Sequence, residues 1–311
     1  MQPARGTGHG VWDKLRRNRV LLVMIAPAVL FFLVNNYIPM AGIILAFKEY
    51  NFRGGIFFSP WAGLGNFRFL FLSGEVFAAL RNTVLYNLSF LVLENFAGIL
   101  LAIFLSELTA VHFRKVAQAL LFLPYILSWV VIGAISFNFF NYEFGAINTV
   151  LKSFGMSPVN FYGETAAWPF IIAAFDVWKG AGYASVLYLA TIVGIDQELH
   201  EAAQIDGAHI FDRIRHITIP HVKPTLVTLV LLAVGRIFSG NFQMFFQLVG
   251  NNSILYPSTD VIDTLVTRML MSSNEIGFAA AAGLIQSVFG FVVIMVVNAA
   301  VRHFDHENAL F

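Results

Sequence analysis

Four charged side chains interrupt stretches of the sequence that are otherwise long and apolar: Glu94, Asp176, Lys179 and Arg236. An ionised group near the centre of a bilayer costs about 2.5–3.5 kcal/mol on insertion scales, so such groups face protein or water rather than lipid. Asp176 and Lys179 are three residues apart, which places them on one helical face, where each can neutralise the other. Charges of this kind mark either a structural pair or the path of a polar substrate.

Aromatic and amide side chains accompany these charges. Trp178 and Tyr183 flank the Asp176–Lys179 pair, and aromatic rings beside polar groups suit stacking on sugar rings. The guanidinium of Arg236 would suit an acidic sugar. For Asp176 and Lys179, a structural pair or a side chain that reaches the interface is the alternative. The expected substrate path consists of the following charged, aromatic and amide side chains: Glu94, Asp176, Trp178, Lys179, Tyr183, Arg236, Phe238, Asn241 and Gln243.

The elements that must position these residues are membrane-spanning helices. Of the 311 residues, 58% are hydrophobic and only 12% are charged, where a soluble domain carries about 25% charged residues. A span needs roughly 20 apolar residues, and the sequence contains six stretches of that kind: 20–47, 83–105, 116–140, 166–193, 222–249 and 277–301. We therefore expect an all-α membrane protein with six transmembrane helices.

The basic residues indicate the orientation of these spans. Five of them, including Arg16, Arg17 and Arg19, fall in the first 19 residues, and basic residues favour the cytoplasmic side. Six spans then place both termini in the cytoplasm. The expected organisation is a cytoplasmic N-terminal tail at 1–19, a transmembrane domain at 20–301 and a cytoplasmic C-terminal tail at 302–311. The transmembrane domain contains a cytoplasmic loop at about 194–221.

The loop between the fourth and fifth spans has the densest polar pattern in the chain. Asp196 can cap a helix, and Gly207 can end it in the left-handed conformation. A second short helix is expected from about 208 to 216, followed by a stiff joint at Pro220 and Pro224. The alternative is an amphipathic helix on the lipid headgroups, but such helices carry a basic polar face, and this one is acidic.

Several kinds of chemistry are excluded by what the sequence lacks. There is no Gly-x-x-x-x-Gly-Lys-Ser/Thr motif, so the chain itself has no P-loop for ATP. The absence of cysteine removes disulfides, thiol nucleophiles and thiolate metal sites. All eight histidines lie outside the expected spans without metal-ligand spacing. The net charge of +1 excludes a nucleic-acid binder driven by bulk electrostatics.

Glu201-Ala202-Ala203, followed by Gly207 and then by Ile217-x-Ile219-Pro220, resembles the signature loop of permease subunits of bacterial ATP-binding-cassette (ABC) importers. The family usually has Leu in place of Ile219. Motifs such as Asn82-Thr83 and Leu123-Pro124 are similar to those of the sugar-type permeases. The segments 51–55 and 260–264 resemble the polysaccharide and oligosaccharide branch, without the large outer domain of the maltose-type subunit.

This resemblance, which covers residues 20–301, implies a type I ABC importer permease in the cytoplasmic (inner) membrane. It implies four partners besides membrane lipid and the sugar: a second homologous permease, two ATPase subunits that bind ATP and Mg, and an extracytoplasmic solute-binding protein. The chain itself would bind no cofactor or metal and would not be an enzyme. The residues that the resemblance assigns to coupling with the ATPase are Glu201, Ala202, Ala203, Asp206, Gly207, Ile217 and Pro220.

Two other classes of protein compete with this interpretation. An ion-coupled secondary sugar carrier would act alone and would use Glu94, Asp176 and Lys179, but such carriers usually have inverted repeats and broken helices, and the sequence indicates neither. A membrane enzyme acting on lipid-linked sugars would need acidic or histidine clusters at a membrane surface. The only clustered acidic residues lie in the loop beside Ala202 and Ala203, where they indicate docking rather than catalysis.

Overall fold

The computed structural model describes residues 18–271 and 275–304. This part of the chain is helical, as the sequence predicts, and the one β-bridge in it joins Lys48 to Trp61. Five helices in the described residues are long and apolar enough to cross a membrane, and there are six such candidates if one bent pair of helices is counted as a span. The predicted tails at 1–19 and 302–311 fall largely outside the described residues.

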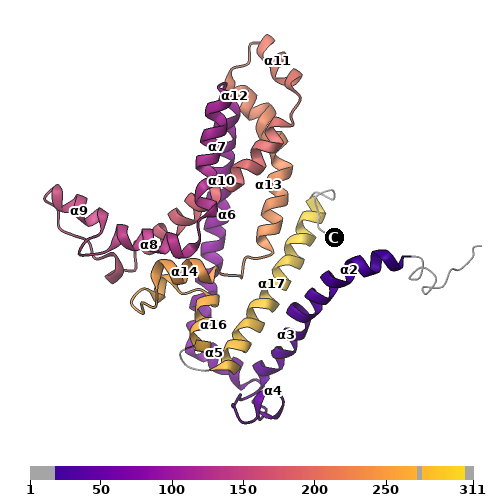
Figure 1. Cartoon of the computed structure of the whole chain (residues 1–311), viewed down its shortest axis with the longest axis vertical. Coiled ribbons are helices and arrows are strands. Elements are labelled where there is room, and N and C mark those ends of the chain that lie inside the picture. The colour runs from indigo at the N-terminus through magenta and orange to yellow at the C-terminus, as the bar shows by residue number, and fades with distance from the viewer. Residues whose placement is uncertain (1–17, 272–274, 305–311) are drawn as a thin grey trace, which may run out of the picture.

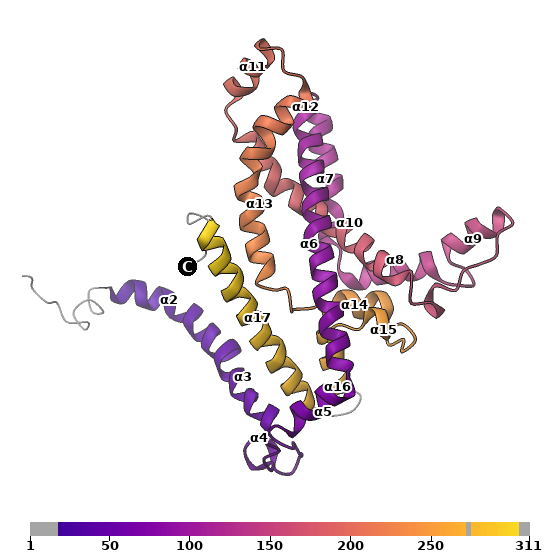
Figure 2. The same cartoon turned by 180° about the vertical axis from the view of Figure 1, so that it is seen from behind.

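The first span diverges from the rest of the molecule (Figures 1 and 2). It runs over Arg19–Phe47 and consists of four helical pieces: α2 (Arg19–Phe32), the π-helix η1 (Leu33–Tyr37), α3 (Ile38–Met40) and the 3₁₀ helix η2 (Ala41–Phe47). No residue of α2 is buried, whereas η2 packs against the last helix, α17 (Ile276–Phe304). The apolar surface of α2 is therefore left for lipid or another subunit to cover.

Two long helices form the axis of the molecule. Two short helices, α4 (Gly55–Phe58) and α5 (Gly65–Ser73), lead into α6 (Glu75–Glu107), and α6 packs extensively against α10 (Trp168–Val193). The helix that contains Leu121, α7 (Val111–Ile126), approaches α10 closely at Gly182, where a Cβ atom would lie 1.8 Å from the carbonyl oxygen of Leu121. Only glycine permits that approach, because any side chain would overlap the backbone of the neighbouring helix.

The third span is not the single helix that the sequence predicts over 116–140. It consists of α7 (Val111–Ile126) and α8 (Trp129–Phe140), which meet at an angle of 94°. Leu127 is extended, and the side chain of Ser128 caps the new helix by accepting a hydrogen bond from Val131 N at 3.4 Å. Beyond α8, the chain forms α9 (Ala146–Ser153) and η3 (Phe161–Gly163), and α8 and α9 extend sideways from the bundle (Figure 1).

The prediction of one span over 222–249 is also wrong. The span is the continuous helix Ile210–Val234, made of α12 (Ile210–Arg213), the π-helix η4 (Ile214–Thr218) and α13 (Ile219–Val234). Residues 235–241 are not helical, and α14 (Phe242–Val249) then packs against α8. Two more helices, α15 (Tyr256–Thr259) and α16 (Ile262–Met271), precede α17.

Candidate functional site: a central cavity and a projecting helix

A cavity of about 900 Å³ lies among α6, α10, α13 and α14. Its polar lining residues come from α6, α10, α14 and the break before α14, whereas α13 contributes apolar side chains: the polar ones are Asn87, Glu94, Asn95, Asp176, Tyr183, Arg236, Ser239, Asn241 and Gln243. Its apolar wall includes Phe90, Leu187 and Phe242. A concave site with an apolar wall and a few convergent polar groups is typical of small-molecule binding.

Two carboxylates and one guanidinium are the acidic and basic side chains of this cavity. Glu94 on α6 faces α10 at Gly180, where a Cβ atom would lie 2.3 Å from Glu94 Oε1. Asp176 lies one turn earlier on α10 and Arg236 follows the end of α13. Among the described residues, no ion pair or hydrogen bond reaches either carboxylate or the guanidinium. These groups are therefore available to polar ligand atoms.

Lys179 does not form the ion pair with Asp176 that their spacing favours. Its Nζ atom donates hydrogen bonds to the carbonyl oxygens of Pro124, Tyr125 and Leu127, at 3.3, 2.7 and 2.5 Å. Those carbonyls lie at the end of α7, where a helix leaves its last C=O groups without partners. Lys179 is thus a cap supplied by a neighbouring helix, and it lines no part of the central cavity.

Two further residues of the predicted path also lie elsewhere. Trp178 lines a separate, smaller cavity of about 340 Å³ between α6, α7 and α10. The ring of Phe238 packs against that of Phe289, with centroids 5.7 Å apart. The structure instead adds Asn87 and Asn95, which the spacing of charges did not single out, although Asn87 lies two helical turns before Glu94 and Asn95 directly follows it.

Side chains from three other elements hold the non-helical segment 235–241. Asn87 Nδ2 donates to the carbonyl oxygens of Ile237 and Ser239 at 2.9 and 3.2 Å, and Gln286 Nε2 donates to that of Phe238 at 2.8 Å. Asp263 Oδ2 accepts a hydrogen bond from Gly240 N at 2.5 Å. Irregular backbone inside a membrane protein requires such partners.

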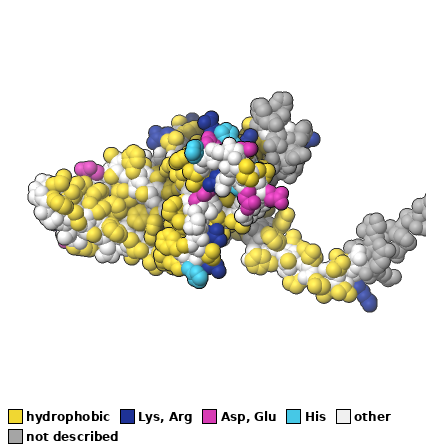
Figure 3. All heavy atoms as spheres, turned by 90° about the horizontal axis from the view of Figure 1, so that it is seen from above, with side chains coloured by type: hydrophobic (Ala, Val, Ile, Leu, Met, Phe, Trp, Pro, Cys, Tyr) yellow, Lys and Arg dark blue, Asp and Glu magenta, His cyan; other side chains and the backbone are white. Residues whose placement is uncertain are grey.

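A second candidate site is α11 (Gln197–Ile205), which projects from the end of the bundle (Figures 1 and 2). Asp196 caps it as predicted, because its Oδ1 accepts a hydrogen bond from Glu198 N at 3.0 Å. Gly207 ends it at φ +82°, in the left-handed region, also as predicted. In the view toward this end of the molecule, charged and histidine side chains gather around its centre, and hydrophobic side chains cover much of the rest of the visible face (Figure 3).

Glu201 stands on α11 as an exposed carboxylate. Its Oε1 accepts a hydrogen bond from Gln197 Nε2 at 3.0 Å, one turn earlier on the same helix. Ala202 and Asp206 are exposed beside it, and Ala203 is half-buried. Ile205 is 87% exposed, so α11 presents apolar surface together with a carboxylate. Such a surface fits a protein partner better than water.

The predicted helix at 208–216 is not separate from the fifth span. From Ile210 the helix runs through a π turn at Ile214–Thr218 and past Pro220 to Val234. The wider turn precedes Pro220, which has no N–H to donate. Ile217 and Pro220 therefore lie below α11 in the spanning helix. Arg213 Nη2 lies 3.8 Å from Glu107 Oε2, which links this helix to the end of α6.

The sequence matches one known family over residues 94–306, described as "Binding-protein-dependent transport system inner membrane component". Protein LplB of Bacillus subtilis (strain 168) is 31% identical over 308 residues, which are 98% of this chain and 96% of LplB. The polygalacturonan/rhamnogalacturonan transport system permease protein YteP of the same organism is 32% identical over 95% of this chain and 91% of YteP.

The fold is similar to that of a chain in the crystal structure of a bacterial ABC transporter involved in the import of the acidic polysaccharide alginate. The TM-score is 0.86 at 29% sequence identity, over 95% of this chain and 99% of the other. A chain of the same kind of transporter, in complex with alginate pentasaccharide-bound periplasmic protein, gives a TM-score of 0.85 at 29% identity, over 94% and 98%.

Proposed function

The chain belongs to the family of binding-protein-dependent transport system inner membrane components, and on this premise we propose that it passes an oligosaccharide through its central cavity. It is a multi-pass permease subunit of a sugar ABC importer in the inner membrane, as the resemblance of its sequence motifs implies. The observation that carries the proposal is the 900 Å³ cavity, which is lined by hydroxyl, amide and charged groups. The names of YteP and of the alginate transporter support a polysaccharide-derived substrate.

The proposed substrate path consists of six of the nine residues that the sequence pointed to: Glu94, Asp176, Tyr183, Arg236, Asn241 and Gln243. They surround the cavity from α6, α10, α14 and the break before α14. Sugar hydroxyls both donate and accept hydrogen bonds, so carboxylates and amides serve them equally. Arg236 adds a group that fits an acidic sugar.

The proposed docking element for the ATPase is α11. Its exposed Glu201 suits an arginine of the partner, and the small side chains of Ala202 and Ala203 permit close approach. Gly207 turns the chain back toward the helix at Ile210. Family membership supports the remaining partners, namely a second permease and a solute-binding protein, and ATP and Mg belong to the ATPase pair.

The helix Ile210–Val234 can transmit a displacement of α11 to the cavity. It runs without a break from the base of α11 to Arg236 and the segment 235–241. ATP-driven displacement of α11 would move this helix as one body, and 235–241 would take up the change as a hinge before α14. Because α14 and α13 both line the cavity, the hinge would open it to one side or the other.

The test is uptake by proteoliposomes that contain this chain, its second permease, the ATPase and the binding protein. Glu201→Lys should abolish ATP-coupled uptake without loss of folding or membrane insertion, because the new charge repels the partner arginine. Glu143→Lys makes the same charge change at another exposed carboxylate, before α9, and should leave uptake intact. Wild-type uptake by Glu201→Lys would refute the docking role, and uptake by this chain alone would favour a secondary carrier.

A further inference from the structure

A third and smaller pocket lies on the other side of α14 from the central cavity. It has a volume of about 220 Å³ and is lined mainly by residues of α14, α15 and α16. Phe242 lines both the pocket and the central cavity. These helices lie in the half of the molecule away from α11 (Figures 1 and 2). A ligand in this pocket is therefore one helix away from the proposed substrate path.

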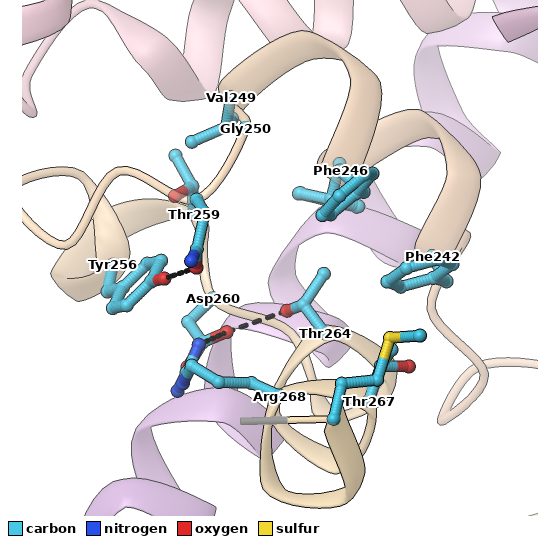
Figure 4. Close-up of a pocket in the computed structure, with 13 residues that line it drawn as sticks. Phe242, Phe246, Val249, Gly250, Tyr256, Thr259, Asp260, Thr264, Thr267 and Arg268 are labelled. Carbon is cyan, nitrogen blue, oxygen red and sulfur yellow. Dashed lines mark hydrogen bonds and ion pairs between the residues drawn. The ribbon is translucent and has the colours of Figure 1, made fainter. Parts of the chain in front are cut away.

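Aromatic rings form one wall of the pocket. Phe242 and Phe246 are stacked, with centroids 5.1 Å apart and an angle of 25° between their planes. Phe246 remains 45% exposed, so one of its faces is open to a ligand. Figure 4 shows these two rings on one side of the pocket and Tyr256, Asp260 and Arg268 on the other. A volume of this size is below the range for drug-sized ligands and suits a single ring.

The opposite wall carries a paired carboxylate and guanidinium. Arg268 donates to Asp260 at 3.0 Å (Nη1 to Oδ1) and 2.6 Å (Nη2 to Oδ2), and Thr264 Oγ1 donates to Asp260 Oδ1 at 2.6 Å. The guanidinium lies over the Tyr256 ring, 4.2 Å from its centroid. Asn82 Nδ2 fixes the segment by donating to the carbonyl oxygen of Asp260 at 3.0 Å.

This wall offers donors and acceptors side by side. A carboxylate has about four acceptor positions and a guanidinium has five N–H donors, so both retain capacity beyond their mutual bonds. Thr267 adds a hydroxyl to the lining. Adjacent sugar hydroxyls, each of which donates and accepts, match this arrangement. A sugar carboxylate does not, because Asp260 would repel it and already neutralises Arg268.

We propose that the pocket between α14 and α16 is a second sugar subsite, which binds one neutral, hydroxyl-bearing sugar unit beside the central cavity. The proposal rests on the proposed function and adds to it a specificity for an uncharged unit. The exposed face of Phe246 stacks on the sugar ring, and the Asp260–Arg268 pair binds its hydroxyls. Phe242 lines both cavities and lies between this unit and the central cavity.

The first experiment measures binding without transport. The full chain is reconstituted in lipid nanodiscs, and saturation-transfer NMR is recorded with methyl α-galactoside as the neutral probe and galacturonate as the acidic one. We expect a signal from the neutral probe that Phe246→Leu weakens. Phe291→Leu is the matched control, because Phe291 is 64% exposed on α17 and lines neither cavity. Equal signals in all three proteins, or a preference for galacturonate, would overturn the proposal.

The second experiment measures transport by the assembled importer. Phe246→Leu, and separately the isosteric Thr267→Val, should raise the KM for oligosaccharide uptake about threefold to tenfold, the range expected for one aromatic or hydrogen-bond contact. The control Phe291→Leu should leave both the KM and the ATP hydrolysis without substrate unchanged. Unchanged KM values for both variants would overturn the subsite. Absence of uptake by the wild-type importer would instead count against the proposed function, and the nanodisc experiment would then decide on the pocket.

Discussion

Replacement of Lys179 by methionine separates a structural role from a role in the substrate path. Lys179 Nζ is the hydrogen-bond donor to three carbonyl oxygens at the bend between α7 and α8, at 2.5–3.3 Å. It also lies 5.6 Å from the Tyr125 ring centroid and 5.4 Å from that of Trp129. Methionine keeps an unbranched apolar stem of similar length but cannot donate, so Lys179→Met removes the cap and leaves the packing.

The magnitude follows from the lost hydrogen bonds. A hydrogen bond to a charged group contributes about 1.5–3 kcal/mol, and the three bonds share one ammonium, so their contributions are not additive. We expect the free energy of unfolding to fall by about 2–4 kcal/mol. At about 2 °C per kcal/mol for a large domain, the unfolding temperature should fall by roughly 4–8 °C.

The assay is thermal unfolding of the purified chain in detergent, followed by uptake measurements in proteoliposomes. Lys115→Met is the control, because Lys115 is exposed on α7 and caps no helix end. The folded fraction of Lys179→Met should show the wild-type KM for the sugar, since Lys179 lines no part of the central cavity. An unchanged unfolding temperature together with a raised KM would refute the capping role of Lys179. It would indicate instead that Lys179 contacts the substrate, as the sequence predicted.

Three further predictions concern the cavity and the break before α14. Arg236→Ala should reduce uptake of an acidic oligosaccharide more than that of a neutral one, with ATPase stimulation intact; equal uptake of both at the wild-type rate would remove Arg236 from the path. Asn87→Leu removes two hydrogen bonds to the segment 235–241 and should lower the free energy of unfolding by about 1–3 kcal/mol, which thermal unfolding measures against Ser89→Ala, an exposed change on the same helix. Burial raises the pKa of Asp263 above its ordinary value of 3.8, against opposing hydrogen bonds from Gly240 and Gln286. The protonated form is then favoured in the folded state, so the stability it contributes is present at low pH and is lost as the pH rises through the folded-state pKa. The unfolding temperature of Asp263→Asn should therefore rise relative to the wild type as the pH increases from 3.8, and a pH-independent difference would contradict this.

Residue types and spacing singled out four intramembrane charges, and three of them share one cavity in the structure. Glu94, Asp176 and Arg236 were expected at a substrate path, and the structure brings them to one cavity. Lys179 has the same sequence signal, a charge in an otherwise apolar run, but it caps a helix instead. Spacing along α10 cannot distinguish these cases, because the partner carbonyls of Lys179 lie 52–55 residues earlier in the chain.

What the sequence alone determined is local or compositional. The low content of charged residues requires lipid contact, the lengths of apolar runs give the spans, and Asp196 and Gly207 fix the ends of α11 through their own backbone neighbours. These features depend on bilayer thickness and on hydrogen bonds within a few residues. They can therefore be predicted from the sequence without knowledge of the tertiary structure.

Only the tertiary structure decided where the spans break and which polar groups share a cavity. Residues 127–128 lie in a largely apolar run, so hydropathy does not mark the first break. The second break contains Gly235, Arg236, Ser239, Gly240 and Asn241, which permit a turn but do not by themselves require one. Those breaks persist because distant side chains bind the exposed carbonyls: Lys179 for the first, and Asn87, 150 residues from Ile237, for the second. A buried backbone group must have a partner, and the identity of that partner is a property of how the helices pack.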